Sequence, residues 1–303
     1  MRKIKLGKSD LRVSEIALGC MRMSELDTND AKKVIETAHN EGINFYDHAD
    51  IYGKGESEVR FKEALKKTSI NRNEILLQSK IGIRAGFYDF SKEHIISSVE
   101  GSLKRLGTDY LDTLLLHRPD TLVEPEEVAE AFDQLHSSGK VKHFGVSNHS
   151  PLQIELLKKY VNQELIANQL QFGVMHTGMV DAGINVNTKD GNAIDHDRAV
   201  LDYSRLNDMT IQPWSPVHGE KGVFLNNPDY KKVNDKLSEV GEKYGLDNEA
   251  MSISWILRHP AQMQVILGTM TPERIKNYSK ATNIRMTRKE WYDIYSAAGN
   301  SIP

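Results

Sequence analysis

The sequence predicts one α/β domain with the (β/α)₈ architecture, a TIM barrel that carries an N-terminal β-hairpin cap and two extra helices. Eight apolar, strand-like segments alternate with helical segments along the 303 residues, and such alternation indicates a parallel sheet. Barrels of this kind often have a comparable length as a single domain. No stretch rich in proline or serine divides the chain, so residues 1–303 are expected to form one domain.

The alternative architecture is a doubly wound open sheet. That fold places a glycine-rich phosphate-binding turn after its first strand, and the segment Gly19 to Glu25 is not such a turn. A G-x-G does occur at Gly53 and Gly55. Its third glycine is missing and it follows a different strand, so loop geometry is the better interpretation. The strand count therefore favours the closed barrel.

The elements follow one another in a regular order. Two short β-type segments, 4–6 and 13–16, flank the turn-forming residues 7–10 and predict the hairpin. The expected barrel strands are residues 16–19, 43–47, 75–80, 110–117, 143–147, 165–172, 210–214 and 264–267. The expected helices are residues 29–40, 56–67, 91–106, 126–138, 150–160, 196–206, 227–244, 248–258, 272–281 and 287–298.

Local signals mark several helix ends. Ser91 is an N-cap and Gly107 a stop signal, while Ser150 precedes a proline at the first helical position. The segment 173–195 is long and rich in glycine and asparagine, and such loops are usually functional or disordered. Two interpretations stay open: either a mobile surface insertion, or a segment that lines the substrate pocket through Met175, His176, Met179 and Val180.

Composition and charge argue against several classes of protein. Lysine and arginine number 39 against 42 aspartates and glutamates, a net charge of −3 with the signs interspersed, so no basic stripe for nucleic acid is present. The only cysteine, Cys20, permits no disulfide within the chain, which fits a reducing compartment. No apolar run predicts a signal peptide or a membrane helix. We therefore expect a cytoplasmic protein that is a monomer or a small homo-oligomer.

Polar side chains follow three neighbouring barrel strands. Asp47 ends the second strand, Lys80 the third and His117 the fourth, and barrel enzymes build their sites at these carboxyl ends. Each residue alone is usually an ordinary loop or core residue. The presence of an acid, a lysine and a histidine at the same rim of the barrel is much harder to attribute to coincidence. Tyr52 lies in the loop after Asp47 and would join them there.

These four residue types suit the reduction of a carbonyl group. Negative charge grows on the carbonyl oxygen as hydride arrives, so a proton donor must stand close to it. A tyrosine has a pKa of about 10, and an ammonium at about 4 Å would lower it by up to about three units. Asp47 would keep Lys80 charged, and His117 would orient the carbonyl. This argument does not choose among the phenols nearby.

The chain resembles the aldo-keto reductases over nearly its whole length, most closely the bacterial YdhF-like oxidoreductases. The similarity lies in NFYDHADIYGKGESE, LLQSKIG, LDTLLLHRPD, KVKHFGVSNHSP, ANQLQF, QPWSPV and LGTMTPERI. The resemblance implies a (β/α)₈ barrel with a hairpin plug and two extra helices. It also implies a catalytic tetrad at Asp47, Tyr52, Lys80 and His117, with Tyr52 as the general acid in the NADP-dependent reduction of a small aldehyde or ketone to an alcohol.

The resemblance also implies a nicotinamide cofactor site. Ser147, Asn148 and Gln169 match residues that bind the carboxamide, and Trp214 stands where the family usually stacks a tyrosine on the nicotinamide. The full implied set is Cys20, Met21, Asp47, Ser147, Asn148, Gln169, Trp214, Ser215, Pro216, Val217, Gly268, Thr269, Met270, Arg274 and Asn277. Many relatives have a lysine near 268–270 that meets the 2′-phosphate. Here Arg274, alone or with Lys276, would supply that charge, so NADP is expected and NAD is the alternative.

Two other functions compete with the reductase. A cofactor-binding sensor or regulatory protein on the same fold is one, since fold does not determine function. The other is a metal-dependent hydrolase with Asp47, His48, Asp50 and His117 as ligands. Neighbouring residues on a strand end point apart, which argues against Asp47 and His48 sharing a metal. Reduction of a small-molecule carbonyl compound, with no resident metal, is the function that the sequence favours.

Overall fold

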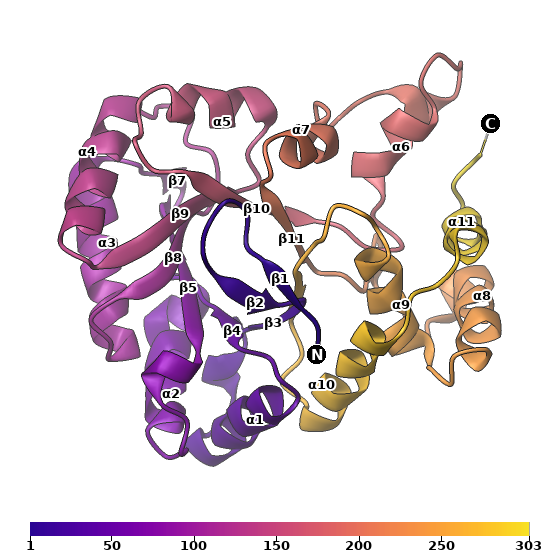
Figure 1. Ribbon diagram of the computed structural model, residues 1–303, viewed down its shortest axis with the longest axis horizontal. Coiled ribbons are helices and arrows are strands. Elements are labelled where there is room, and N and C mark those ends of the chain that lie inside the picture. Colours follow the sequence, from indigo (N-terminus) through magenta and orange to yellow (C-terminus); the bar gives the residue numbers. More distant parts are fainter. Residues whose placement is uncertain (303) are drawn as a thin grey trace.

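Eight parallel strands form a closed ring with helices around it (Figure 1). The computed structural model describes residues 1–302. Neighbouring strands pair in the order β11-β10-β9-β8-β5-β4-β3-β14, and the backbone N–H of Gln264 donates to the carbonyl oxygen of Ile211 at 3.1 Å, joining the two ends. The strands are β3 (Ile16–Gly19), β4 (Phe45–Asp47), β5 (Leu76–Ile81), β8 (Leu111–Leu116), β9 (Val141–Ser147), β10 (Leu165–Gln171), β11 (Thr210–Trp214) and β14 (Val265–Leu267). The predicted barrel is confirmed.

The predicted helices are present as well, with small shifts at their ends. Ser91 accepts a hydrogen bond from the N–H of His94, Gly107 adopts φ 66°, and the backbone N–H of Ser150 donates to Gln153 Oε1 at 2.9 Å, at the helix starts and stop that the sequence signals indicated. The helices are α1 (Thr28–Asn40), α2 (Glu56–Leu65), α3 (Lys92–Leu106), α4 (Pro125–Ser137), α5 (Pro151–Lys158), α7 (Val200–Leu206), α8 (Lys231–Glu242), α9 (Asn248–Leu257), α10 (Pro272–Ser279) and α11 (Arg288–Ala297).

The N-terminal hairpin closes one end of the barrel. Its antiparallel strands β1 (Lys3–Lys5) and β2 (Arg12–Ser14) lie across the barrel in Figure 1. Ile4, Leu6 and Val13 join a separate apolar cluster with side chains from the barrel strands. Gly7 adopts φ +54°, and a Cβ there would lie 2.2 Å from the carbonyl oxygen of Ile166, so only glycine fits. With this end plugged, the carboxyl ends of the strands remain for a site.

The segment 173–195 contains short helices that the sequence did not predict. Helix α6 (Gly178–Ile184) and the 3₁₀ turn Gly191–Ala193 interrupt the expected loop. Two glycines within the seven residues of α6 give it a low intrinsic propensity. It is held by tertiary contact, because the Tyr295 hydroxyl donates to Asp181 Oδ1 at 2.8 Å. Such contacts cannot be read from local sequence.

Other boundaries also differ from the predictions. The helix expected from 196 begins only at Val200, because Ala199 has left-handed backbone angles (φ 55°). The helix expected from 227 begins at Lys231, because Asn227 caps a separate 3₁₀ turn, Pro228–Tyr230. Two small antiparallel pairs were not predicted because each strand has only two residues. They are β6 (Ile83–Arg84) with β7 (Phe87–Tyr88) and β12 (His218–Gly219) with β13 (Gly222–Val223).

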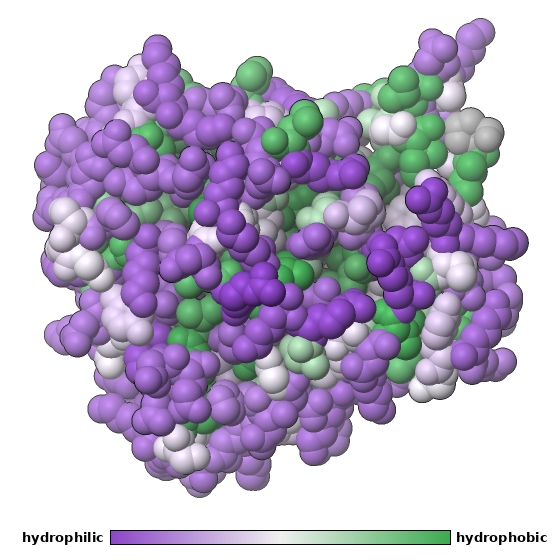
Figure 2. Space-filling view, viewed as in Figure 1, coloured by the Kyte–Doolittle hydropathy of each residue, from purple (hydrophilic) through white to green (hydrophobic). Residues whose placement is uncertain are grey.

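Hydrophilic residues cover most of the face shown in Figure 2, and hydrophobic residues gather beside α6. Val186 and Ile194, in the segment around that helix, are 70% and 63% exposed. Among residues 1–302, no helix has both the length and the apolar character needed to cross a membrane.

Candidate active site

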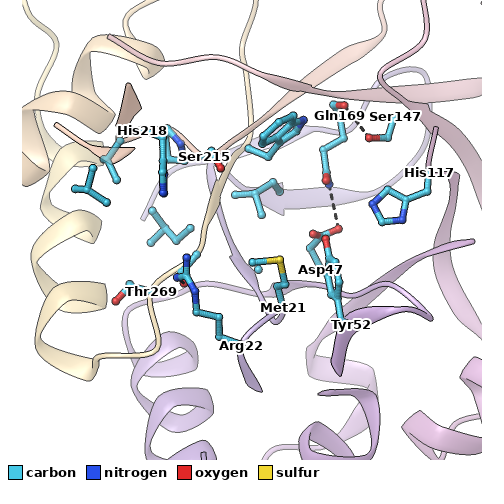
Figure 3. Close-up of a pocket in the computed structure, with 18 of the residues that line it drawn as sticks. Met21, Arg22, Asp47, Tyr52, His117, Ser147, Gln169, Ser215, His218 and Thr269 are labelled. Atoms are coloured by element: carbon cyan, nitrogen blue, oxygen red, sulfur yellow. Dashed lines mark hydrogen bonds between the residues drawn. The ribbon is translucent and has the colours of Figure 1, made fainter. Parts of the chain in front are cut away.

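A cavity of about 450 Å³ opens at the carboxyl ends of the barrel strands (Figure 3). Ligand sites of enzymes typically have volumes of about 300–1,000 Å³. Tyr52 and His117 lie at one end of it in Figure 3, while Arg22, His218 and Thr269 lie at the other. The cavity is lined by most of the predicted site residues, namely Met21, Asp47, Tyr52, His117, Ser147, Asn148, Gln169, Trp214, Ser215, Pro216, Val217, Gly268, Thr269 and Arg274.

Three predicted cofactor residues do not line this cavity. The Cys20 side chain is fully buried and its thiol donates to the carbonyl oxygen of Leu18 at 3.6 Å. The Asn277 amide donates to Asp247 Oδ2 at 2.6 Å, and Met270 packs against the core. Each of these three residues lies close in the sequence to a residue that lines the cavity, but its own side chain points elsewhere. The structure therefore does not bring these three side chains to the site.

Lys80 and Asp47 form a buried ion pair behind the cavity wall. They lie on the adjacent strands β4 and β5, and the Lys80 ammonium donates to both oxygens of Asp47 at 2.8 and 2.7 Å and to the carbonyl oxygen of His48 at 2.9 Å. Burial alone would lower the pKa of Lys80, but the charge of Asp47 and the Tyr52 phenol outweigh it and raise that pKa. Lys80 is therefore held as a cation.

Tyr52 lies between the ion pair and His117. The Lys80 nitrogen is 5.0 Å from the centre of the Tyr52 ring, and the rings of Tyr52 and His117 meet edge to face with centroids 6.0 Å apart. Burial raises the pKa of Tyr52 above its usual 10.0 even though the charge of Lys80 lowers it. The predicted net lowering of this pKa is therefore wrong, because the argument from the sequence omitted the cost of burying a phenolate.

His117 is neutral in this environment. Burial, followed by the charges of Lys80 and Arg118, lowers the pKa of His117 to about 2. Its Nδ1 atom is buried without a hydrogen-bond partner among the described residues. A neutral imidazole has one N–H to donate, so His117 presents a hydrogen-bonding edge to the cavity without carrying a charge.

A chain of glutamine side chains fills the barrel interior beneath Asp47. The amides of Gln78 and Gln169 donate to Asp47 Oδ1 at 2.7 and 3.0 Å. Gln78 also donates to Gln212, Gln212 donates to Gln264, and Gln264 donates to the carbonyl oxygen of Ser14 in the hairpin. The sequence reasoning missed Gln78, Gln212 and Gln264 as members of this network. The usable signal was a glutamine within β5 and β11 and directly before β14.

A second network of polar side chains lies beside Trp214. Ser147 Oγ donates to the carbonyl oxygen of Gln169 at 2.9 Å, and the Asn148 amide donates to Ser147 Oγ at 2.8 Å. The indole N–H of Trp214 donates to Asn148 Oδ1 at 3.3 Å. Asn148 has a left-handed backbone (φ 60°), which asparagine tolerates better than most residues. The carboxyl ends of β9, β10 and β11 thus combine amide groups with one large aromatic face.

Two arginines stand at the far end of the cavity. Arg274 is paired with Glu249 at 2.8 Å and also donates to the Tyr278 hydroxyl. Arg22 instead donates to the carbonyl oxygen of Gly268 at 2.5 Å and, among residues 1–302, forms no ion pair. Sequence reasoning missed Arg22, because a lone basic residue after a strand carries no distinctive pattern. Together the two guanidinium groups favour an anionic ligand at this end.

The residues suggested for a metal site do not converge. His48 is fully buried, lies with its ring 4.6 Å from that of Phe61, and burial lowers its pKa to about 3. No group of three or more histidine, cysteine, aspartate or glutamate side chains within residues 1–302 is arranged to hold a metal ion.

The inserted segment contributes to a second chamber beside the cavity. His176 and Met179 line this chamber of about 280 Å³. Val180 instead lines a separate hollow with Met179, and Met175 packs against the core. The segment therefore forms part of the wall next to the site.

Comparisons with known proteins agree with this geometry. The model of the aldo/keto reductase family matches residues 15–298. The uncharacterised oxidoreductase YcsN of Bacillus subtilis is 35% identical, with 100% of each chain covered. The 6-dehydroglucose reductase of Agrobacterium fabrum is 34% identical, with 98% of each chain covered, and the oxidoreductase YdhF of Escherichia coli is 33% identical over 100% of each.

A solved structure supports the fold. The crystal structure of a thermostable aldo-keto reductase in complex with the inhibitor epalrestat superposes with a TM-score of 0.79 at 21% identity, covering 98% of this chain and 100% of the other. The family match and the full-length relatives at 33–35% identity show the protein family in addition to the fold. The chain therefore belongs to the aldo/keto reductase family and is an NAD(P)H-dependent oxidoreductase.

Proposed function

We propose that the protein uses NADPH to reduce small aldehydes or ketones to alcohols, with Tyr52 as the general acid. The observation that carries this proposal is the juxtaposition of Tyr52 and His117 at one end of the cavity, in front of the buried Lys80–Asp47 pair. The name of the Agrobacterium relative, a 6-dehydroglucose reductase, is consistent with a carbonyl substrate.

The cavity residues fit a nicotinamide dinucleotide. Ser147, Asn148 and Gln169 offer amide and hydroxyl groups for the carboxamide, and Trp214 offers an aromatic face for the ring. Arg22 and Arg274 would hold the phosphates. When bound, this cofactor supplies the hydride.

The chain's own residues would supply the proton and the orientation. His117, neutral at physiological pH, donates an N–H to the carbonyl oxygen and holds it near Tyr52. Tyr52 donates its phenolic proton to that oxygen as negative charge develops. Lys80 stabilises the phenolate that remains, and Asp47 keeps Lys80 charged and directed at Tyr52.

The two arginines favour NADPH over NADH. Arg274 is already paired with Glu249, so Arg22, which has no carboxylate partner among residues 1–302, adds the charge that a 2′-phosphate requires. We expect Arg22→Met to weaken NADPH binding about 10-fold and NADH binding less, since a charge-assisted hydrogen bond contributes roughly 1.5–3 kcal/mol. Calorimetric titration of both nucleotides measures this, and equal losses for the two would argue against selection by Arg22.

The Tyr52→Phe variant tests the catalytic role. Steady NADPH oxidation with a reactive aldehyde should fall at least about 100-fold in this variant, because general acid catalysis typically contributes 10²–10⁴-fold. The affinity for NADPH should stay nearly unchanged, which serves as the control for folding. Unaltered turnover would remove Tyr52 from the acid role, and a wild-type protein that binds NADPH without oxidising it would favour the cofactor-binding sensor.

A further inference from the structure

Tyr52 lies in a loop whose own backbone is irregular. Residues 48–55 join β4 to α2, and Gly53, Lys54 and Gly55 at the end of this loop all have left-handed backbone angles, with φ 57°, 57° and 93°. A lysine in this region persists only where the surrounding structure holds it there. The place of the Tyr52 phenol therefore depends on contacts between this loop and the elements beside it.

Two consecutive residues of β5 hold the chain on both sides of Tyr52. On one side, the backbone N–H of Asp50 donates to the carbonyl oxygen of Lys80 at 3.0 Å. On the other side, the Ser79 hydroxyl donates to Glu58 Oε1 at 2.8 Å, which ties the first turn of α2 to the strand. Because Lys80 belongs to the same strand, these two bonds place the phenol of Tyr52 and the ammonium of Lys80 relative to one common element.

The Glu58 carboxylate is fully buried and has two partners. Besides Ser79, the Arg105 guanidinium of α3 donates to its Oε2 atom at 2.7 Å. The Arg105 side chain also lies against Gly55, where an added Cβ would stand 2.9 Å from Cδ. Replacing a buried ion pair by apolar side chains is often neutral or even stabilising, so folding stability alone gives no reason for a charge here. A carboxylate with one oxygen bonded to β5 and the other to α3 instead fixes the start of α2 in two directions.

We propose that Glu58 is a positioning residue, which fixes the distance between the Tyr52 phenol and the Lys80 ammonium. It acts through its bonds to Ser79 and Arg105, and none of these three side chains lines the catalytic cavity. The inference rests on the proposed function, since it assumes that Tyr52 donates the proton. The interaction between two charges weakens with distance, so a loosened α2 would reduce the support that Lys80 gives to the phenolate.

The Ser79→Ala variant removes the bond between Glu58 and β5 and leaves the ion pair with Arg105 in place. We expect the single-turnover rate of NADPH oxidation at saturating butanal to fall about 10- to 100-fold, because a displacement of about 1 Å can cost 100-fold in rate. The KM for butanal and the Kd for NADPH should stay within about twofold, since the cavity walls are unchanged. Glu58→Gln keeps an oxygen for the Ser79 hydroxyl, so it should lose less of the rate than Glu58→Ala.

A second buried carboxylate provides a matched control. Arg72 pairs with Asp112 at 2.8 Å, and Arg105 pairs with Glu58 at 2.7 Å; the two arginine side chains are 23% and 29% exposed. The hydrogen bonds of Arg72 all go to residues outside the loop 48–55. Arg72→Met and Arg105→Met should therefore lower the melting temperature by similar amounts. Only Arg105→Met should slow the single turnover, by about 10-fold, and Arg105→Lys should restore part of the rate.

Combining Ser79→Ala with Lys80→Met tests the route by which Glu58 acts. If Glu58 holds Tyr52 at the Lys80 charge, the double variant should be no slower than Lys80→Met alone, within about twofold, because that charge is gone. A general loosening of the barrel would instead multiply the two losses, and that result would overturn the proposal.

The remaining outcomes also decide the question. A Ser79→Ala rate within about twofold of the wild type, an equal slowing in Arg72→Met and Arg105→Met, or a change confined to KM or to the NADPH Kd overturns the positioning role while the reductase function stands. Should Ser79→Ala fail to fold, which circular dichroism shows, the comparison of the two arginine variants carries the test. Unaltered turnover in Tyr52→Phe overturns the proposed function, and this inference with it.

Discussion

The Lys80→Met variant tests how the buried ion pair supports proton donation. Methionine has a similar reach without the charge, and the Lys80 nitrogen lies 5.0 Å from the centre of the Tyr52 ring. Two unit charges at that separation interact by about 3 kcal/mol at an effective dielectric near 20. Dividing by 1.36 kcal/mol per unit gives roughly 2 pKa units. Burial already raises the pKa of Tyr52, so the variant should raise it further.

The expected loss of activity follows from that shift. If half of the lost interaction is expressed in the transition state, kcat/KM falls about 10-fold, and if all of it is expressed the loss is about 100-fold. Reduction requires protonated Tyr52. The alkaline limb of the profile of kcat/KM against pH should therefore lie above pH 10 in the wild type, since the pKa of Tyr52 in the folded protein exceeds 10.0. The limb should move to still higher pH in Lys80→Met, while the plateau activity is lower.

A second variant separates catalysis from folding. Removing one member of a buried pair leaves the other charge unpaired and typically costs about 3–5 kcal/mol of stability. The double variant Asp47→Asn/Lys80→Met removes both charges and should recover much of the melting temperature without recovering activity. NADPH oxidation as a function of pH and thermal denaturation by circular dichroism measure the two effects. A folded Lys80→Met protein whose kcat/KM stays within about twofold of the wild type would refute the reasoning.

Three further predictions concern stability and reactivity. Arg72→Met should lower the free energy of unfolding by about 1–3 kcal/mol, measured by urea denaturation, because Arg72 donates to the buried Asp112 at 2.8 Å; an unchanged midpoint would contradict this. Burial, with a smaller contribution from Glu58, raises the pKa of Asp50 from 3.8 to about 7. The folded protein therefore binds the extra proton between these values, and stability falls as pH rises through about 7. Asp50→Asn should raise the melting temperature above that pH and flatten its pH dependence. Cys20 is fully buried with a raised thiol pKa, so a thiol-specific reagent should label it only after unfolding, and rapid labelling of the native protein would contradict the structure.

The barrel and the residues at its rim were predictable because they leave local signals. Each strand is a buried run bounded by turn residues, and Asp47, Lys80 and His117 each come at or just after a strand end. Helix α6 was not predictable, since its stability comes from contacts such as that between Tyr295 and Asp181. The sign of the Tyr52 pKa shift also needed the structure, because Coulomb attraction follows from residue types whereas desolvation depends on burial.

The cofactor residues illustrate the same distinction. Positions at strand ends, such as Ser147 and Trp214, line the cavity as predicted, because the strand fixes where their side chains point. For residues beyond the strand ends, the direction of the side chain could not be read from the sequence. Cys20 turns into the core although Met21 lines the cavity, and Asn277 turns to Asp247 although Arg274 lines the cavity. Arg22 lines the cavity and donates to the carbonyl oxygen of Gly268, which is distant in sequence, so its place there could not be read from local sequence.

The glutamine chain inside the barrel has a direction. Gln212 and Gln264 each use the oxygen toward one neighbour and the nitrogen toward the other, ending on the Ser14 carbonyl, which can only accept. Gln78 differs, because its nitrogen donates to both Gln212 and Asp47 while its oxygen has no partner among the described residues. Turning any one amide over would place two oxygens or two N–H groups against each other. Both ends of the chain, the Ser14 carbonyl in the N-terminal hairpin and the Asp47 carboxylate at the opposite mouth, can only accept, so Gln78 must donate in both directions. Removal of the Ser14 carbonyl would leave the Gln264 amide free to turn over and would loosen the far end of this chain, while Lys80, Gln78 and Gln169 still hold Asp47 directly.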